Sequence, residues 1–194
     1  MALLFVLSGP SGVGKDSLLA RMKGRGLHLH FTVTAATRPP RPGEKDGVDY
    51  HFLSPERFSQ MREMGELLEC AQVYGHWYGV PKAEIRSALT QGLDVMIKVD
   101  VQGAATIRDL LPQAVSIFLV PPGVEELERR LASRRTEGGA SLELRLRTAQ
   151  EEMKHLPLFD YVVINDDLGR AAGRVEAIIT AENCRVNPRR VELP

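Results

Sequence analysis

The sequence predicts an α/β fold in which helices flank a parallel central sheet. Two observations lead to this prediction. Short, almost wholly apolar runs recur along the chain, and each one precedes or follows a stretch with helical character. Runs without polar alternation are typical of strands buried on both faces, as in a parallel sheet between two layers of helices. The expected strands span residues 3–7, 94–99, 115–120 and 161–164.

Helical patterns fill most of the chain between these runs. Residues 121–152 are nearly all helical and rich in Arg, with Gly138 and Gly139 at a flexible tip, which is typical of a mobile lid. The helices are expected over residues 15–23, 82–91, 103–111, 124–134, 142–156 and 168–182.

The segment before residue 82 lacks the alternation of buried strands and helices seen elsewhere in the chain, which indicates an inserted small α/β lobe. A Pro-rich turn is followed there by a helical stretch and by strand-like pieces at 67–73 and 77–80. We therefore expect a single domain over residues 1–194. Its expected parts are a core of about 1–33, 81–120 and 153–194, the lobe at about 34–80, and the lid at about 121–152.

The composition argues against several classes of protein. Lys plus Arg and Asp plus Glu both number 25, so no overall field attracts nucleic acid or an anionic membrane. Cys70 and Cys184 are too few for a disulfide framework and have no zinc-site spacing. The apolar start is too short for a membrane span, so it is interpreted as the first strand. A compact domain in a reducing cytoplasm is expected.

The first expected strand leads directly into the glycine-rich sequence SGPSGVGKDSL. A strand, such a loop and a helix direct backbone N–H groups and the positive end of the helix dipole at an anion. Gly12 and Gly14 allow close approach of the backbone, and Lys15 can reach the outer phosphates of a nucleotide. The next residue is normally a Ser or Thr whose hydroxyl binds Mg²⁺. Here it is Asp16, and Ser17 supplies a hydroxyl one position later.

Phosphoryl transfer needs cations that neutralise phosphate charge, and two Arg clusters are candidates. Arg38 and Arg41 stand in the Pro-braced turn ATRPPRPG, with Tyr50 and Tyr78 as further donors. A solvated loop is an equally good interpretation of this turn, because Arg side chains are mostly exposed. For the expected lid, a surface helix with Glu–Arg pairs is the alternative. The lid cluster comprises Arg130, Arg134, Arg135, Arg145 and Arg147.

The segment MIKVDVQGA marks the carboxyl end of an expected strand. Side chains alternate along a strand, so Lys98 and Asp100 project from one face at the edge where open α/β sheets bind ligands. Asp100 is therefore a candidate for a Mg²⁺ shell or for contact with a substrate hydroxyl. An Asp here is also typical of a helix cap, and the helix expected from Gly103 keeps that alternative open.

With these features in place, the chain resembles the guanylate kinase family over essentially its whole length. The matching segments, in the family's order, are GPSGVGK, TRPPRPGEKDGVDYHF, ECAQVYGHWYG, DVQGA, PPGVEELERRL and VVINDDL. The resemblance implies a P-loop kinase fold in which the small lobe binds GMP. It also implies that ATP and GMP or dGMP are the small-molecule partners, that Mg²⁺ is required, and that ADP and GDP or dGDP are the products.

The resemblance assigns the acceptor site to the small lobe. It implies that Arg38, Arg41, Tyr50 and Tyr78 hold the GMP phosphate, whereas Glu69 and Thr34 bind the guanine edge. A carboxylate there accepts two donors that adenine does not present in the same way, which explains how such a site would discriminate. The implied GMP contacts are Thr34, Arg38, Arg41, Tyr50, Glu69, Tyr78, Val80 and Asp100.

The resemblance assigns the donor site to the glycine-rich loop, with Asn165 near adenine. The implied ATP contacts are Gly9, Pro10, Ser11, Gly12, Val13, Gly14, Lys15, Asp16, Ser17 and Asn165. The implied catalytic cations are Lys15, Arg41, Arg130, Arg134 and Arg145, and the expected metal ligands are Asp16 and Asp100.

Three positions depart from the family's pattern. Asp16 replaces a Ser or Thr, Lys98 replaces an acid, and Val80 replaces a hydroxyl that would contact guanine. The first two changes look linked, because an acid is gained in the loop while a base replaces an acid in the neighbouring strand. We therefore expect either an Asp16–Lys98 ion pair near the metal, or Asp16 as a Mg²⁺ ligand with Lys98 offsetting its charge.

Three other functions remain as alternatives from the sequence. The GKDS string also resembles the ribose bisphosphate phosphokinases of phosphonate metabolism, which lack the segments expected for a guanine site. Guanylate-kinase-like scaffold domains bind peptides, but they have lost the loop lysine that this chain retains as Lys15. An enzyme that Asp16 has disabled, and that still binds nucleotide, is the third alternative.

Overall fold

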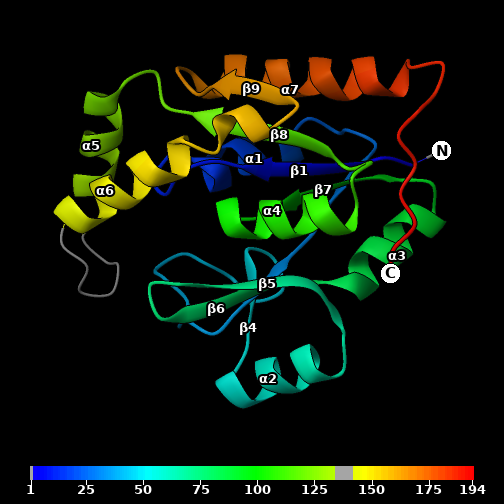
Figure 1. Cartoon of the computed structure of the whole chain (residues 1–194), viewed down its shortest axis with the longest axis horizontal. Coiled ribbons are helices and arrows are strands. Elements are labelled where there is room, and N and C mark those ends of the chain that lie inside the picture. Colours follow the sequence, from blue (N-terminus) through cyan, green and yellow to red (C-terminus); the bar gives the residue numbers. More distant parts are fainter. Residues whose placement is uncertain (1, 134–141) are drawn as a thin grey trace.

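The structure, a computed structural model, describes residues 2–133 and 142–194. Its central sheet has five parallel strands in the order β2-β7-β1-β8-β9, which confirms the predicted fold class (Figure 1). The strands are β1 (Leu4–Ser8), β2 (Leu29–Phe31), β7 (Asp94–Lys98), β8 (Val115–Val120) and β9 (Tyr161–Ile164).

Two pairs of helices cover the two faces of this sheet. Helices α1 (Lys15–Lys23) and α7 (Leu168–Asn183) pack on one face, and α3 (Lys82–Thr90) and α4 (Val101–Leu110) pack on the other. Strand β1 alternates between these two cores, so all five of its residues are buried. Strand β9 at the edge is an exception, because its alternate apolar side chains are 54% and 45% exposed (Val162 and Ile164).

A second, smaller sheet lies beside the α3 and α4 face, in the order β4-β3-β6-β5. Its strands are β3 (Thr34–Ala36), β4 (Tyr50–Phe52), β5 (Leu67–Val73) and β6 (His76–Pro81). Helix α2 (Pro55–Glu63) covers it through the buried ring of Phe58. On the other side, Leu68 and Val80 pack into the same core as α3 and α4. This packing fixes the small sheet next to the central one.

The Arg-rich segment begins as predicted with α5 (Val124–Ser133), and it continues in α6 (Leu142–Met153). Leu127, Leu131 and Ala149 join these two helices in a core of their own. A short 3₁₀ turn, η1 (Leu156–Leu158), leads from α6 to β9. The predicted glycine tip, together with Arg134 and Arg135, lies outside the described residues.

The structure differs from the sequence prediction at several points. The strands β2, β3 and β4 were not predicted, because three residues are too few to display a periodicity. Helix α4 begins at Val101 rather than Gly103, because Asp100 caps it. Helix α6 ends at Met153, before the 3₁₀ turn, rather than at residue 156. Within the described residues, no helix is both long and apolar enough to cross a membrane.

Candidate active site

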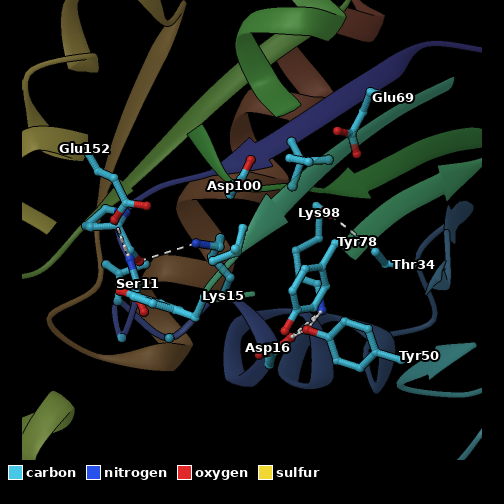
Figure 2. A pocket seen from close by; sticks show the side chains of 18 of the residues that line it. Ser11, Lys15, Asp16, Thr34, Tyr50, Glu69, Tyr78, Lys98, Asp100 and Glu152 are labelled. Carbon is cyan, nitrogen blue, oxygen red and sulfur yellow. Dashed lines mark hydrogen bonds and ion pairs between the residues drawn. The ribbon is translucent and has the colours of Figure 1, made fainter. Parts of the chain in front are cut away.

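A central cavity opens where the glycine-rich loop, the carboxyl end of β7 and the small sheet meet (Figure 2). The loop contributes one wall, and side chains of the small sheet contribute the opposite wall. The lining includes Lys15, Asp16, Thr34, Arg41, Tyr50, Glu69, Tyr78 and Asp100, all of which the sequence predicted as site residues. It also includes Lys98, which the sequence analysis expected beside Asp16, and residues that were not predicted for a nucleotide site, namely Ala71, Val73, Tyr74, Val99 and Glu152.

The loop requires glycine at two positions for different reasons. Gly9 has φ 142°, and a Cβ built there would lie 2.3 Å from the carbonyl oxygen of Leu119. Gly14 has φ 100° and precedes the first residue of α1, so it adopts the left-handed conformation at the helix N-terminus. The chain can therefore turn sharply and direct the start of α1 at the cavity, which is the arrangement that binds an anion.

Lys15 lies folded over this loop. Its Nζ donates to the carbonyl oxygens of Gly9 at 2.5 Å and Pro10 at 3.3 Å. Burial lowers the pKa of Lys15, although the carboxylates of Glu152, Asp16 and Asp100 act in the opposite direction. The ammonium group is thus held at the place where phosphate groups bound to the loop would lie.

Glu152, on the last turn of α6, is a site residue that the sequence analysis did not identify. Its Oε2 accepts a hydrogen bond of 2.9 Å from the backbone N–H of Ser11 in the loop. Burial raises the pKa of the Glu152 carboxyl, while Ser11 and Lys15 partly oppose the shift. The sequence offers no signal for this contact, because 141 positions separate the two residues.

Asp16 and Lys98 form an ion pair, which was one of the two arrangements that the sequence analysis expected. The Nζ of Lys98 lies 2.5 Å from Oδ1 of Asp16, and it also donates to the hydroxyl of Tyr50 at 2.8 Å. Burial acts to lower the pKa of Lys98, but Asp16 and Tyr50 raise it by more, so the net shift is upward. Lys98 is therefore a charged group that links the loop side of the cavity to the small sheet.

Asp100 serves as the helix cap that the sequence left open as an alternative. Its Oδ1 accepts a hydrogen bond of 2.7 Å from the backbone N–H of Gly103, at the start of α4. The same side chain lines the cavity beside Lys15. Capping thus fixes one carboxylate oxygen and orients the group toward the site.

Glu69 is a buried carboxylate at the far end of the cavity from the loop (Figure 2). Burial raises its pKa to about 8, and the charge of Asp100 adds to the shift. A Cβ at Gly103 would lie 2.6 Å from Oε2 of Glu69, so glycine at this position in α4 makes room for the carboxylate. No described residue donates a hydrogen bond to Glu69.

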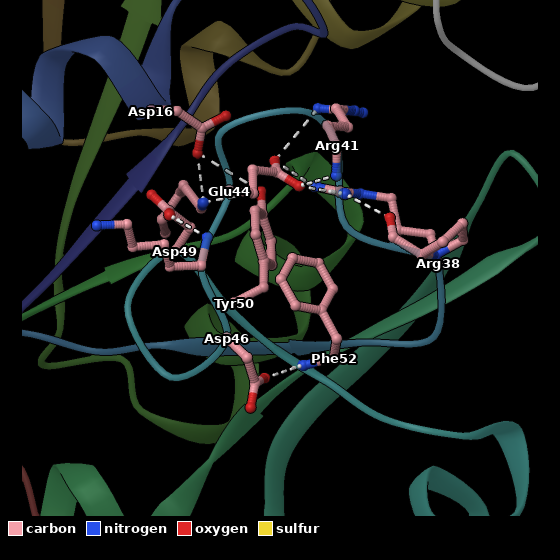
Figure 3. Close-up of polar contacts among 11 residues, drawn as sticks. Asp16, Arg38, Arg41, Glu44, Asp46, Asp49, Tyr50 and Phe52 are labelled. Atoms are coloured by element: carbon pink, nitrogen blue, oxygen red, sulfur yellow. Dashed lines mark hydrogen bonds and ion pairs between the residues drawn. The ribbon is translucent and has the colours of Figure 1, made fainter.

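The two arginines of the Pro-braced turn have different surroundings (Figure 3). The guanidinium of Arg38 makes a bidentate pair with Glu44, at 2.6 and 2.8 Å, and its side chain is only 6% exposed. Arg38 also lies 4.6 Å from the ring centroid of Tyr50. Arg41 lines the cavity, and its backbone N–H donates to Glu44 at 2.8 Å. The turn is thus a braced structure rather than a solvated loop.

Of the remaining predicted GMP contacts, three line the cavity and one lies in the core. Thr34 is buried, and its hydroxyl lies 3.4 Å from the carbonyl oxygen of Lys98. The rings of Tyr50 and Tyr78 meet edge to face, and burial raises the pKa of Tyr78. Val80 corrects a prediction, because its fully buried side chain packs in the core with α3 and α4 instead of lining the cavity.

A second cavity lies on the other side of the loop, next to α5. Arg130 donates to the carbonyl oxygens of Val13 at 2.9 Å and Asn165 at 3.0 Å. The Asn165 amide also donates to Val13, at 2.8 Å. Arg145 is different, because it is buried and donates to Leu131 within the α5–α6 core. The lining comprises Gly12, Gly14, Ser17, Glu126, Arg129, Arg130, Asn165 and Leu168.

Asp16 and Asp100 are the candidate metal ligands among the carboxylates that line the central cavity. Among the described residues, no group of three or more His, Cys, Asp or Glu side chains is arranged to hold a metal ion. Asp16 and Asp100 both line the central cavity near Lys15. Two carboxylates fit Mg²⁺, which is usually bound by one or two carboxylates together with substrate phosphates and water.

Comparison with known proteins identifies close relatives. Residues 1–182 match the family model described as guanylate kinase. Guanylate kinase 2, chloroplastic/mitochondrial, of Oryza sativa subsp. japonica is 46% identical over 98% of this chain and 68% of its own length. Guanylate kinase of Clostridioides difficile (strain 630) is 43% identical over 95% of this chain and 90% of its own. The crystal structure of guanylate kinase from Anaplasma phagocytophilum superposes with a TM-score of 0.81 at 32% identity, covering 95% and 88% of the two chains.

Proposed function

The chain belongs to the guanylate kinase family and is a nucleoside monophosphate kinase, and we propose that its central cavity is where the γ-phosphate of ATP passes to GMP or dGMP. One observation carries the proposal. The cavity joins a phosphate loop to the buried carboxylate of Glu69, which accepts no hydrogen bond from a described residue. Leaving such a group unpaired is unfavourable, and the N–H donors of guanine would satisfy it.

The donor nucleotide occupies the loop side. Backbone N–H groups of residues 12–17, at the N-terminus of α1, bind its phosphates, and Lys15 moves from the loop carbonyls to the outer phosphates. Asn165 and Arg130 hold the loop through Val13, and their cavity accepts the adenine side of ATP.

The acceptor nucleotide occupies the small-sheet side. Glu69 and Thr34 bind the guanine edge, while Arg41, Tyr50 and Tyr78 hold the phosphate. Arg38 contributes by bracing the turn through Glu44 and by lying against the ring of Tyr50. In this proposal, the acceptor phosphate lies between the guanine site and the loop.

The reaction needs no nucleophile from the protein. A phosphate oxygen of GMP attacks the γ-phosphorus in line while the protein neutralises charge on the transferred group. Mg²⁺, held by Asp16 and Asp100 together with nucleotide phosphates, would supply additional positive charge. Closure of the segments around the cavity excludes water, which would otherwise compete as acceptor. The lid cations in this proposal are Arg130, Arg134 and Arg145, of which Arg145 is buried between α5 and α6 and would have to move to reach a phosphate.

We also propose how the chain is divided into parts, which partners it binds and in which compartment it works. The core, the GMP-binding lobe and the lid act as parts of one domain, with boundaries near residues 34, 81, 121 and 153. Nucleotides are the partners, rather than nucleic acid or membrane, and the compartment is a reducing cytoplasm. The balanced charge and two cysteines without a disulfide support these assignments.

The test is an acceptor panel. Purified protein is mixed with ATP, Mg²⁺ and one of GMP, dGMP, AMP, UMP or ribose 1,5-bisphosphate, and ADP release is measured. We expect ADP with GMP and dGMP only. ADP with ribose 1,5-bisphosphate alone would support the phosphokinase alternative. ADP with none of the acceptors would indicate a protein that binds nucleotide or peptide without turnover.

A further inference from the structure

Lys98 connects the two halves of the central cavity. It ends β7 of the central sheet, and its Nζ bonds to Asp16 of α1 at 2.5 Å and to the hydroxyl of Tyr50 of the small sheet at 2.8 Å (Figure 2). Asp16 belongs to the proposed donor side and Tyr50 to the proposed acceptor side. The ammonium group therefore lies between the proposed donor side and the proposed acceptor side of the cavity.

The surroundings of Lys98 leave it able to bind a phosphate. An ammonium group has three N–H donors, and two of them are directed at Asp16 and Tyr50. Among the described residues no acceptor takes the third, and the side chain lines the cavity while remaining 12% exposed. Within the part of the chain that the structure describes, the Tyr50 hydroxyl donates only a long hydrogen bond of 3.5 Å, to Asp16. A phosphate that took this donor instead would lie within reach of the third donor of Lys98.

The two cations beside the Tyr50 ring differ in how their charges are neutralised. This ring has Lys98 Nζ at 4.1 Å and the Arg38 guanidinium at 4.6 Å from its centroid. Arg38 is neutralised by a bidentate pair with Glu44. Lys98 is paired with Asp16, whose side chain is 46% exposed, whereas the Glu44 side chain that pairs with Arg38 is 18% exposed. The charge of Lys98 is therefore less completely shielded from a ligand in the cavity than the charge of Arg38.

We propose that Lys98 is a further catalytic residue, which contacts the acceptor phosphate and the phosphoryl group in transit. This inference rests on the function proposed above. In the step, a bond forms between a GMP phosphate oxygen and the γ-phosphorus, while the bond from that phosphorus to the bridging oxygen breaks and its electron pair leaves with ADP. Lys98 keeps its proton throughout and acts by its charge and its donors.

The competing interpretation is that Lys98 only neutralises Asp16. The two roles separate in a comparison of Lys98→Met, Asp16→Asn and the double variant. If Lys98 is only a counter-ion, removing the carboxylate makes it dispensable, so the double variant equals Asp16→Asn. If Lys98 contacts the acceptor, the double variant stays well below Asp16→Asn.

We expect Lys98→Met to raise KM for GMP about 10- to 100-fold and to lower kcat, with little change in the dissociation constant of ATP. The double variant should stay at least about tenfold below Asp16→Asn in kcat/KM for GMP. Lys154→Met is the matched control, because Lys154 is exposed and pairs only with Glu151 among the described residues. Should Lys98→Met not fold, Lys98→Gln allows the same comparison.

Calorimetric titration with GMP measures the dissociation constant, and so tests the proposed contact between Lys98 and the GMP phosphate without any turnover. Wild-type GMP affinity in Lys98→Met, or a double variant equal to Asp16→Asn, would overturn the inference. A wild-type protein that binds GMP but forms no ADP would instead overturn the proposed function. In that case, weaker GMP binding by Lys98→Met would still support the contact. A wild-type protein that binds no GMP would overturn both.

Discussion

The two sides of the central cavity are built in different ways. The loop side is one continuous stretch of chain, in which backbone groups and the start of α1 form the anion site. The small-sheet side gathers side chains from β3, β4, β5 and β6 and from the Pro-braced turn. The loop side therefore depends on backbone conformation, whereas the small-sheet side depends on the identity of individual side chains.

The two sides also differ in how their charges are satisfied. On the loop side, Lys15 already bonds to the carbonyl oxygens of Gly9 and Pro10. On the small-sheet side, Glu69 is buried with no hydrogen bond from a described residue. A ligand must replace existing bonds on one side and fill an unpaired site on the other. Substitutions on the two sides should accordingly affect different kinetic constants.

The largest effect is expected at Lys15. Lys15→Met removes the cation that would neutralise the transferred phosphoryl group, so kcat should fall about 100- to 1,000-fold. The dissociation constant of GMP should not change, because the proposed acceptor site is on the opposite side of the cavity. Steady-state kinetics and GMP calorimetry measure the two quantities. A shift in GMP binding as large as the fall in kcat would show that the two sides are not separate.

The next largest effect is expected for Glu69→Gln, which replaces a carboxylate, whose two oxygens would accept the two proposed guanine donors, by an amide with a single acceptor oxygen. We expect kcat/KM for GMP to fall about 100-fold, while the dissociation constant of ATP is unchanged. Glu63→Gln is a suitable control, since Glu63 is exposed at the end of α2. Equal loss for ATP and GMP would contradict the assignment of Glu69 to the guanine edge.

Arg41→Ala should raise KM for GMP about tenfold without altering KM for ATP. Arg38→Ala is the comparison, because Arg38 is buried in its pair with Glu44. Removing Arg38 leaves Glu44 without its bidentate partner, so the main expected result is a lower melting temperature. A rise confined to KM for ATP in Arg41→Ala would reverse our assignment of the two sides.

The pH dependence of GMP binding is expected to follow Glu69, whose pKa is raised to about 8. Below that pH the protonated carboxyl cannot accept from both guanine donors, so GMP should bind about tenfold more tightly at pH 9 than at pH 7. Glu69→Gln should lack this dependence. Calorimetry across this range provides the measurement, and a wild-type profile that matched the variant would contradict the prediction.

The raised pKa of Glu69 should also make the stability of the fold depend on pH. The pKa of Glu69 is higher in the folded protein than the ordinary value of 4.5, so the folded state retains a proton that the unfolded state has lost. The contribution of Glu69 to stability therefore declines as the pH rises from about 4.5 to about 8. Relative to Glu69→Gln, the wild-type protein should lose free energy of unfolding over this interval, as measured by urea denaturation.

The smallest effect is expected at Glu152. Glu152→Ala removes the acceptor that holds the N–H of Ser11, so the loop should bind ATP about threefold to tenfold more weakly. Glu152→Gln keeps an acceptor and should retain most of the affinity. Glu151→Ala is the matched control, because Glu151 is exposed and pairs only with Lys154 among the described residues. Identical ATP binding in all three variants would exclude a role for this contact.

Some features were available in the sequence because they are local. The loop, the helix that follows it and the longer strands of the central sheet each have a continuous pattern, and α1 and β8 have the predicted bounds. The Asp16–Lys98 pair was also foreseen, since two compensating changes of charge against the family pattern indicated it. The three-residue strands and the direction of the Val80 side chain were not foreseen.

The sequence by itself determined the layered α/β fold and the phosphate loop, because hydrophobic periodicity and glycine conformation act over a few neighbouring residues. It indicated the family through six separate segments that resemble the family's in the same order. Only the tertiary structure decided which side chains share one cavity. Glu152 reaches Ser11 across 141 positions, and Lys98 reaches Asp16 across 82. Such contacts depend on how helices and the small sheet pack on the central sheet, and packing is a property of the whole fold.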